Sequence, residues 1–521
     1  MAEVIKKRKA KSPIKALNKG YSEAGASITK KALKGFNAVS GSPREDIDYN
    51  NQTLRERSRI LAMASPIASS AIRTNRTNVV GMGLRMQPRI DRDILKMSSE
   101  QADELQKMIT REWDIWASNP RAVDALGISN FADIERLVLT SWLLSGDVFV
   151  VMQQRQPTTM MPYSSRVMVI EADRIATPTA NDTIAGPMTT GVNSDNGNYI
   201  YDGVEVDESG TIVAYWIRNT YPGEFGFPKE TKWQRVKAFN SDTGFANVIQ
   251  IMDPERPEQY RGVPYLAPVI EQLLQMRRYS ESELMAAVIE SFFTAFVKTE
   301  AGADENPFNE TEELTPEERN TQNDDEYSMG PGQVNFMQPG EDIVFANPTR
   351  PANGFDTFVK SICSQIGAAL EIPKDLLLKE FNASYSASRA ALMEAWKAFK
   401  MRRELIVDKF CNPVYAQWFS EAVARGRINA PGFFEDPIRR AAYLGVEWVG
   451  PSQGQLDPIK EVNAEAAMIK EGFSTHEQST ARLTGGDWTK NIEQLKKENA
   501  LLGGLGEPDP HQDKGGEESA S

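Results

Sequence analysis

Apolar residues recur at spacings of three, four and seven along the first part of the chain, which predicts amphipathic helices. The first helical pattern covers residues 51–78, and Pro66 should bend it or open a new helix because proline lacks the amide hydrogen that a helix interior uses. Residues 99–117 and 131–144 carry two further helical patterns. Between the first helical pattern and residue 99, residues 84–90 follow a glycine-containing turn and are predicted to form a strand.

The pattern changes to short alternating runs further along, which predicts β-strands. Gly, Asn, Asp and Pro separate these runs. Residues 201–203 and 208–210 are turn signals, and residues 207–210 are predicted to join two antiparallel strands. The predicted strands cover residues 148–152, 167–170, 200–206, 212–218 and 246–252. Together with the preceding helices, these strands predict an α+β fold.

Helical spacing returns with three long patterns. The first covers residues 268–297 and predicts a helix roughly 40 Å long, since each residue adds about 1.5 Å. The second covers residues 355–370 and ends before a proline, as the restriction on residues preceding proline requires. The third runs through the apolar positions Leu392 to Phe410, and Pro413 should bend it.

The segments between these three helices are less regular. Residues 332–336 and 343–345 are predicted to be strands, and they follow an acidic stretch. Residues 371–387 are predicted to form an irregular connector, and Ser386 or Ser388 can cap the third helix.

The last part of the chain predicts three short helices. Asp457 can cap the first of them, because proline follows at the first helical position. Ser474 and Glu477 form a possible capping box for the second. Asp487 can cap the third, which should end at Gly503.

Composition and charge add two asymmetries to this picture. The 521 residues are 40% hydrophobic and carry a net charge of -13, which suits a globular chain but not one that binds nucleic acid over its whole surface. Residues 1–44 hold eleven Lys or Arg and two acidic residues. This basic arm indicates either a contact with nucleic acid or an acidic partner, or a solvated tail. Residues 300–326 hold eleven acidic residues and one basic residue, which indicates either a solvated loop or a projecting contact surface.

Residue types exclude most kinds of catalytic site. Two histidines and two cysteines are too few for a His-based triad, a Cys/His zinc site or a disulfide framework. The sequence has no phosphate-binding GxxxxGK[ST] loop, no GxSxG and no HExxH. Acidic pairs such as Asp324 and Asp325 leave a carboxylate-based hydrolase as an alternative. No cofactor and no metal site is predicted. No membrane-spanning segment is predicted either, since the most apolar stretch, residues 137–152, is interrupted by polar side chains.

Five stretches in a fixed order carry a family resemblance. They are RSRILAMASPIASSAIRTNRTNVVGMGLRMQP (57–88), RGVPYLAPVIEQL (261–273), LEIPKDLLL (370–378), ASYSASRAALMEAWKAF (383–399) and LDPIKEVNAE (456–465). None is a catalytic motif, and their order over more than four hundred residues is what makes the match specific. The chain resembles the lambda-type portal proteins of tailed bacteriophages.

The resemblance implies a portal fold with an α/β wing, a two-helix stem, a small α/β clip, a long spine helix and a helical C-terminal crown. Carried over segment by segment, it implies a basic flexible arm (1–48), the wing (49–265), stem helix 1 (266–293), the clip (294–352), stem helix 2 (353–370), a tunnel loop (371–387), the wing spine helix with its following segment (388–455), the crown (456–503) and a disordered tail (504–521).

The same resemblance implies two sets of site residues, and none of them is catalytic. Residues of the DNA channel and tunnel loop would be Lys374, Lys379, Asn382, Ser384, Tyr385 and Arg389. The docking surface of the clip would be Glu310, Glu312, Glu313, Glu317, Glu318, Asp324 and Asp325. Trp396 and Phe399 are expected to lie in the core rather than to stack on DNA bases.

The function implied by the resemblance is that of a head–tail connector rather than an enzyme. Twelve copies would form a ring at one capsid vertex, through which a terminase packages double-stranded DNA and through which the DNA later leaves. The implied partners are the terminase large subunit, a head–tail adaptor, and the major capsid and scaffold proteins. The protein would be made in the host cytoplasm and would end in the virion. The alternatives are another oligomeric virion scaffold or connector without a DNA channel, and the hydrolase named above.

Overall fold

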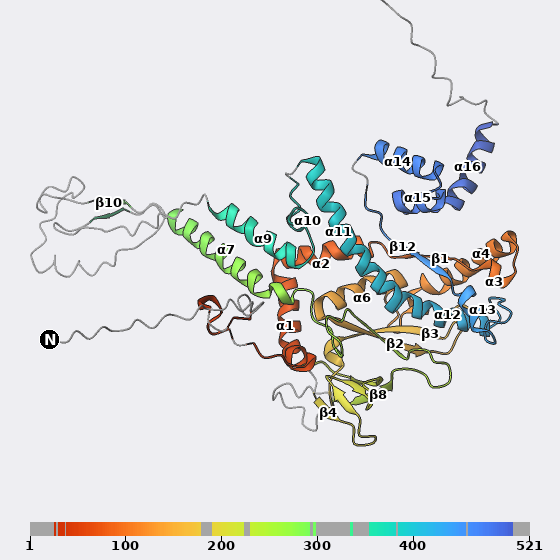
Figure 1. The fold of residues 1–521 in the computed structure, drawn as a ribbon, viewed down its shortest axis with the longest axis horizontal. Coiled ribbons are helices and arrows are strands. Elements are labelled where there is room, and N and C mark those ends of the chain that lie inside the picture. Colours follow the sequence, from red (N-terminus) through yellow and green to blue (C-terminus); the bar gives the residue numbers. More distant parts are fainter. Residues whose placement is uncertain are drawn as a thin grey trace, which may run out of the picture.

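The computed structural model describes residues 26–27, 30–36, 38–178, 190–222, 224, 230–291, 295–297, 334–336, 354–381, 384–454 and 457–503. In the described part of the chain, helices and three small sheets form a body, from which the pair α7 and α9 projects to one side (Figure 1). The C-terminal helices α14, α15 and α16 lie along another side of that body (Figure 1).

The first long helical pattern forms two helices, as predicted. A π-helical turn, η3 (Arg44–Asp48), leads directly into α1 (Tyr49–Ala64), and α2 (Pro66–Val79) follows after one residue. Ser65 separates the two helices because its side chain accepts a hydrogen bond from the backbone N–H of Ala68, while Pro66 occupies the first helical position.

The first sheet and its covering helices share one large hydrophobic core. Strands β2 (Asp147–Gln154), β3 (Ser165–Glu171) and β9 (Val248–Met252) form an antiparallel sheet in the order β3-β2-β9. Helices α4 (Ser99–Ala117) and α6 (Phe131–Ser145) match their predicted positions, and Trp113 of α4 makes edge contacts with Phe131 and Trp418. The aromatic cluster joins segments about three hundred residues apart, so the body folds as one unit.

The second sheet has five short antiparallel strands in the order β4-β5-β6-β7-β8. Their bounds are β4 (Thr190–Val192), β5 (Tyr199–Tyr201), β6 (Val204–Val206), β7 (Ile212–Arg218) and β8 (Trp233–Lys237). The predicted single strand over residues 200–206 is wrong, because the chain turns at Asp202 and Gly203. Both residues have positive φ, and a Cβ at Gly203 would lie 2.5 Å from the backbone nitrogen of Ala176. The predicted turn between β6 and β7 is confirmed.

The first of the three long helices is shorter than predicted. After a 3₁₀ turn, η5 (Ala267–Val269), helix α7 covers Ile270–Ser291. The expected extension to residue 297 is wrong, since Ala295–Val297 forms strand β10, which pairs in parallel with β11 (Val334–Phe336). The aromatic and β-branched pair that ends β10 favours this extended state. The strand predicted over residues 343–345 lies outside the described residues.

The remaining elements complete the body and the C-terminal part. They are η2 (Lys31–Leu33), β1 (Arg85–Pro88), α3 (Arg92–Leu95), α5 (Pro120–Val123), η4 (Ala172–Arg174), α9 (Phe355–Ala369), α10 (Lys374–Leu378), α11 (Tyr385–Ile406), η8 (Val407–Cys411), α12 (Asn412–Ala424), α13 (Pro437–Tyr443), β12 (Val446–Val449), α14 (Pro458–Lys470), α15 (His476–Thr484) and α16 (Trp488–Gly503). Strand β12 pairs antiparallel with β1, so an early and a late segment of the chain lie side by side in the body. Within the described ranges, no helix has both the length and the apolar composition needed to cross a bilayer.

The caps of the C-terminal helices agree with prediction except in one place. The side chains of Asp457 and Asp487 accept hydrogen bonds from backbone N–H groups in the first turns of α14 and α16. The capping box of α15 is formed by Thr475 and Gln478 rather than by Ser474 and Glu477. Ser474 is buried and bonds to a neighbouring serine instead, so it is unavailable as a cap.

A buried carboxyl group gives the body a predictable pH dependence. Glu135 on α6 is fully buried, accepts a hydrogen bond from the backbone N–H of Leu84, and contacts the thiol of Cys411. Burial raises the pKa of Glu135 to about 8. The folded state therefore holds this proton more tightly than the unfolded state, and the stabilisation is lost as the pH rises from about 4.5 toward 8.

We expect Glu135→Gln to remove this part of the pH dependence, since the amide keeps the acceptor for Leu84 but cannot ionise. The measurement is the urea midpoint at pH 5.5 and at pH 8 for both proteins. Glu104→Gln, on the exposed face of α4, is the matched control and should leave the wild-type slope unchanged. If the urea midpoint changed equally between pH 5.5 and pH 8 in Glu135→Gln and in the wild type, Glu135 would not be the source of this pH dependence.

Candidate functional site

The candidate site is the segment that links α9 to α11, where sequence analysis placed a tunnel loop. Helix α9 ends at Ala369, Leu370 is its C-cap residue, and the following residue, Glu371, has a positive φ of 55°. The chain then turns back on the helix, because the backbone N–H of Ile372 donates to the carbonyl of Gly367 at 2.9 Å. A Cβ at Gly367 would lie 2.4 Å from the Ile372 oxygen, so this close return requires glycine.

The first half of the link is packed against α2. Residues Lys374–Leu378 form the short helix α10, and the side chains of Ile372 and Leu377 are each 1% exposed. The Ser70 hydroxyl donates to the Leu377 carbonyl at 2.7 Å. The prediction of an irregular connector is therefore wrong for residues 371–378, where apolar side chains enter the main core.

Arg402 fixes the start of the link from the opposite side. Its guanidinium donates to the Glu371 carboxylate at 2.7 Å and to the Asn75 side-chain oxygen at 3.0 Å, and it lies 4.9 Å from the centre of the Tyr265 ring. Arg402 is buried, and the Tyr265 hydroxyl donates to the Leu370 carbonyl. One arginine thus joins α2, the segment before α7, the end of α9 and α11.

Helix α11 begins earlier than predicted. Ser384 is its N-cap residue, so Ser386 and Ser388 lie inside the helix and do not cap it. The prediction that Trp396 and Phe399 belong to the core is confirmed, since they are 4% and 0% exposed. Helix α11 continues through the π-helical turn η8 into α12, with Pro413 in the first turn of α12.

The structure separates the predicted channel residues by environment. Lys374 is exposed at the start of α10, and Arg389 is exposed one turn into α11. The pKa of Asp457 is lowered mainly by hydrogen bonds from Lys460, and the charge of Arg389 lowers it further. The Lys379 ammonium donates to the Thr74 hydroxyl at 2.9 Å, so this lysine is attached to α2. Ser384 is exposed.

The other predicted site residues fall beyond what the structure describes. Asn382 and the Tyr385 side chain lie outside the described residues. The same holds for the whole predicted clip surface, Glu310, Glu312, Glu313, Glu317, Glu318, Asp324 and Asp325.

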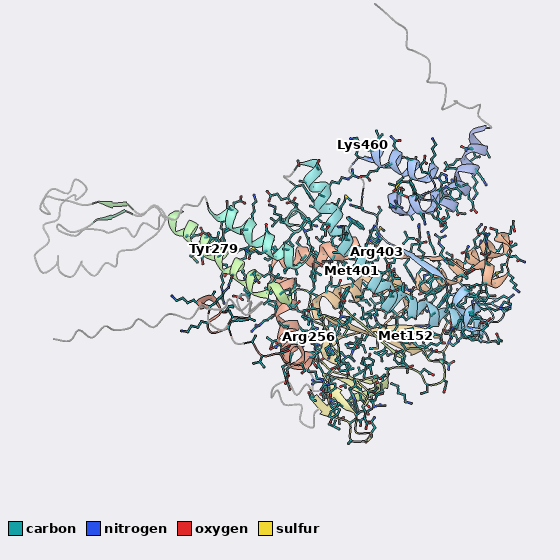
Figure 2. The ribbon with its side chains drawn as sticks, viewed as in Figure 1. Met152, Arg256, Tyr279, Met401, Arg403 and Lys460 are labelled. Atoms are coloured by element: carbon teal, nitrogen blue, oxygen red, sulfur yellow. The ribbon has the colours of Figure 1, made fainter. Side chains whose placement is uncertain are left out.

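Two arginines of α11 were missed by sequence analysis. Arg402 lies three residues after Phe399 and four before Ile406, and this helical spacing on a buried face is the signal that could have identified it. Arg403 donates to the carbonyls of Asn78 and Val79 at the end of α2, each at 2.8 Å. Burial lowers the pKa of Arg403 to about 10. A cation at a helix C-terminus is favourable, so Arg403 holds α2 against α11 (Figure 2).

The projecting helices α7 and α9 pack against each other and leave other apolar side chains exposed. Tyr279 of α7 stacks on Phe355 and packs on Phe358 of α9, with ring centres 5.6 and 4.6 Å apart (Figure 2). The sulfur atoms of Met276 on α7 and Cys363 on α9 lie 3.8 Å apart. Several apolar side chains on this pair remain exposed, namely Leu274, Leu284, Met285, Val288 and Phe358. A group of exposed apolar side chains of this kind is typical of a surface that contacts another molecule.

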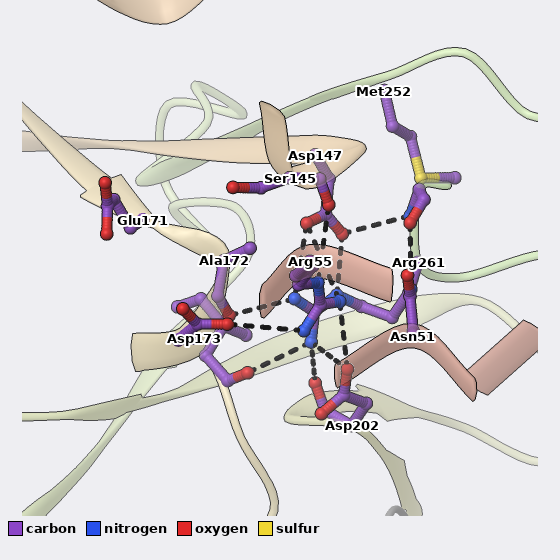
Figure 3. A network of polar contacts seen from close by, with 12 residues as sticks. Asn51, Arg55, Ser145, Asp147, Glu171, Ala172, Asp173, Asp202, Met252 and Arg261 are labelled. Atoms are coloured by element: carbon purple, nitrogen blue, oxygen red, sulfur yellow. Dashed lines mark hydrogen bonds and ion pairs between the residues drawn. The ribbon is translucent and has the colours of Figure 1, made fainter. Parts of the chain in front are cut away.

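A buried ionic network supports the base of α7 (Figure 3). Arg261, just before α7, pairs with Asp147 at the start of β2 at 2.6 Å, and both side chains are 0% exposed. The same guanidinium reaches Asp202 at 2.6 Å, and Arg55 of α1 contacts Asp202 at 3.1 Å. Burial raises the pKa of Asp147, but Arg261 and Arg55 outweigh it and hold this pKa below its usual value. The network joins α1, the first sheet and the β5–β6 hairpin at the start of the stem.

Several buried charged side chains of the described residues join separate elements of the fold. The described residues contain no group of three or more His, Cys, Asp or Glu that could hold a metal ion. Three buried or half-buried arginines, Arg261, Arg402 and Arg403, form ion pairs or hydrogen bonds that join separate elements. These contacts can therefore hold α1, α2, α9, the link and α11 in a fixed relation.

Comparison with known proteins gives consistent matches. The model of the lambda family of phage portal proteins matches residues 29–403. Portal protein B of Escherichia phage lambda is 24% identical over 447 residues, covering 83% of this chain and 80% of that protein. The portal protein of Escherichia phage N15 is 21% identical over 485 residues, covering 90% and 87% respectively. Among solved structures, a chain from the neck of an empty gene transfer agent particle matches with a TM-score of 0.39 and 12% identity, over 86% of this chain and 95% of that one.

Proposed function

The chain belongs to the lambda family of phage portal proteins, and from this we propose that its copies form a ring whose channel passes double-stranded DNA at one capsid vertex. The observation that carries the proposal is the family match over residues 29–403, because this range contains the wing, both stem helices, the link and most of α11. Its role would be structural, with ATP hydrolysis supplied by the terminase. Synthesis in the host cytoplasm and a final place in the virion follow from this role.

The exposed apolar side of the stem supports the ring. On α7, Leu284 is 68% exposed and Met285 is 60% exposed. Exposure of these apolar side chains to water is unfavourable, so burial against another surface would stabilise them. In a cyclic assembly each copy presents two different surfaces, so the side left open on one copy is covered by the next. We propose twelve copies, as the family resemblance implies.

We propose that residues between α7 and α9 dock the packaging and tail proteins. Strands β10 and β11 lie within this region, and the acidic window 300–326 belongs to it. The terminase large subunit and the head–tail adaptor would bind here through the predicted acidic residues, with the major capsid and scaffold proteins contacting the outer body. An acidic lining would also limit DNA binding, because each phosphate neutralised by a basic residue adds affinity through counterion release.

We propose that the part of the link that faces DNA contains fewer residues than the predicted tunnel loop. The packing of residues 371–378 and the attachment of Lys379 to Thr74 support placing the DNA-facing part at residues 380–384. Exposed Lys374 and Arg389 flank this stretch in the sequence and remain the candidates for DNA contact.

The ring is tested by mass photometry and negative-stain imaging of the purified full-length chain. Twelve copies of 58.0 kDa give an expected mass of about 0.7 MDa and a particle with a central hole. A particle population that stays monomeric in the presence of capsid and scaffold proteins would contradict the proposal.

We expect replacement of residues 380–384 by a Gly-Ser sequence of the same length to leave rings intact but to reduce packaging or retention of DNA. The change removes Phe381, which is 60% exposed, without cutting into the packed residues before it. The measurement is DNase-protected DNA per particle, alongside ring mass. The matched control replaces residues 240–244, an exposed turn between β8 and β9, in the same way. Loss of the ring itself, or normal DNA content, would contradict the placement of this stretch in the channel.

A further inference from the structure

Helix α2 exposes two arginines, Arg73 and Arg76. The helix is attached to its neighbours through other positions, since Ser70 and Thr74 bond to α10 and its C-cap residue, and Asn75 accepts a hydrogen bond from α11. By helical spacing, the two arginines lie on the remaining side and next to each other, because residues three apart are neighbours on a helix surface. Neither arginine has a carboxylate partner among the described residues.

A third cation lies beside these arginines. The Lys379 ammonium donates to the hydroxyl of Thr74, the residue after Arg73, at 2.9 Å. A hydroxyl is neutral, so this bond positions the lysine without cancelling its charge. Two of the three acidic side chains in the link are engaged elsewhere, one with α11 and the other with α9: Glu371 and Glu380. The exposed side of α2 therefore carries an excess of positive charge where it meets the link.

Other exposed arginines of the chain show the usual arrangement, in which a carboxylate lies beside the guanidinium. Arg89 pairs with Glu447 at 2.8 Å, and Arg277 pairs with Glu281 at 2.8 Å. The chain has 72 acidic and 59 basic residues, so carboxylates are plentiful. Neighbouring like charges on a helix repel each other, and an anion that binds between them removes this repulsion. The cations on α2 therefore favour an anionic partner.

We propose that Arg73, Arg76 and Lys379 form a phosphate-binding face that contacts the backbone of double-stranded DNA. The choice of DNA rests on the proposed function, because residues 380–384 follow Lys379 directly. One DNA strand carries a negative charge per about 3.4 Å of axis, and the helix advances about 4.5 Å from Arg73 to Arg76, so each arginine can meet a phosphate. Phosphate contacts carry no sequence information, and three of them give only modest affinity, which suits DNA that has to move.

The salt dependence of DNA binding tests this face. Each phosphate contact adds about 0.9 to the slope of log affinity against log salt concentration, so Arg73→Gln/Arg76→Gln should reduce the size of the slope by about 1.8. Between about 50 and 200 mM KCl, the wild type should therefore lose about twelvefold more affinity than this double variant. The measurement is fluorescence anisotropy of a short labelled DNA duplex titrated with the purified full-length chain. The basic arm, residues 1–44, is the same in every variant.

The matched control removes the same charge elsewhere. Arg92→Gln/Arg111→Gln changes two exposed arginines on α3 and α4, at the end of the body away from α10 (Figure 1), and should keep the wild-type slope. Arg73→Lys/Arg76→Lys should keep it as well, because counterion release depends on charge. A reduced slope in the lysine variant, or equal reductions in the two glutamine variants, would overturn the phosphate-binding face.

Mass photometry of the same samples separates this inference from the proposed function. Rings with an unchanged slope in Arg73→Gln/Arg76→Gln would overturn the phosphate-binding face, leave the ring standing, and favour an acidic protein as the partner of α2. A wild type without rings would contradict the proposed function, while the slopes would still show whether these arginines contact phosphate. A wild type that does not bind the duplex at about 50 mM KCl would also overturn the inference.

Discussion

Replacing Arg261 by alanine is expected to destabilise the fold more than any other single change considered. The substitution leaves Asp147 buried with its main counter-charge removed, and Asp202 loses its 2.6 Å contact. Removing one partner of a buried ion pair costs about 3–5 kcal/mol, which is a large part of the roughly 5–15 kcal/mol that stabilises a typical domain. We expect little soluble protein, or a urea midpoint far below that of the wild type, measured by tryptophan fluorescence.

The control for this change is an ion pair of the same residue types on the surface. Arg256 pairs with Asp46, and the two side chains are 37% and 50% exposed. Arg256→Ala should cost at most about 1 kcal/mol, because water replaces the lost partner. Arg261→Lys is a second test, since lysine keeps the charge but cannot also reach the Ile175 and Ala172 carbonyls, as the guanidinium does. A midpoint for Arg261→Ala equal to that of Arg256→Ala would contradict the role given to the network.

The elements that sequence analysis predicted well are those whose ends are set by local chemistry. Helix α4 begins and ends as predicted, and Pro66 separates α1 from α2 because the signals lie within a few residues of each boundary. The strand predicted over residues 200–206 failed for a different reason. Asp202 has a positive φ and its carboxylate faces Arg55 and Arg261, which come from distant segments. Contacts of that kind leave no trace in local periodicity.

The candidate site shows the same division. The family resemblance predicted a tunnel loop over residues 371–387, but it could not tell which of these residues are packed. Leu377 is buried on α2 and Lys379 is bonded to Thr74, about three hundred residues earlier in the chain. Sequence analysis did not identify Arg402, which fixes the start of the link, because its partners Asn75 and Glu371 are brought to it only by folding.

The stem offers the sharpest test of assembly. We expect Leu284→Glu to prevent ring formation while leaving each copy folded. Leu284 is 68% exposed in one chain, so the change costs a single copy little. In a ring it removes about 1.5–3 kcal/mol of apolar burial at every subunit contact and places a carboxylate there without a partner. Because each copy contributes to a closed ring, the penalty is repeated around the whole assembly.

Mass photometry measures whether the Leu284→Glu variant forms rings, and circular dichroism measures whether each copy stays folded. Leu284→Glu should give monomer-sized particles with the helical signal of the wild type, where the wild type gives rings. Met160→Glu is the matched control, since Met160 is 84% exposed in the turn between β2 and β3, away from the stem. That variant should still form rings, because an exposed methionine outside an interface can become a glutamate at little cost. Rings of normal mass from Leu284→Glu would show that α7 does not face a neighbouring copy and that the exposed side of the stem has another partner.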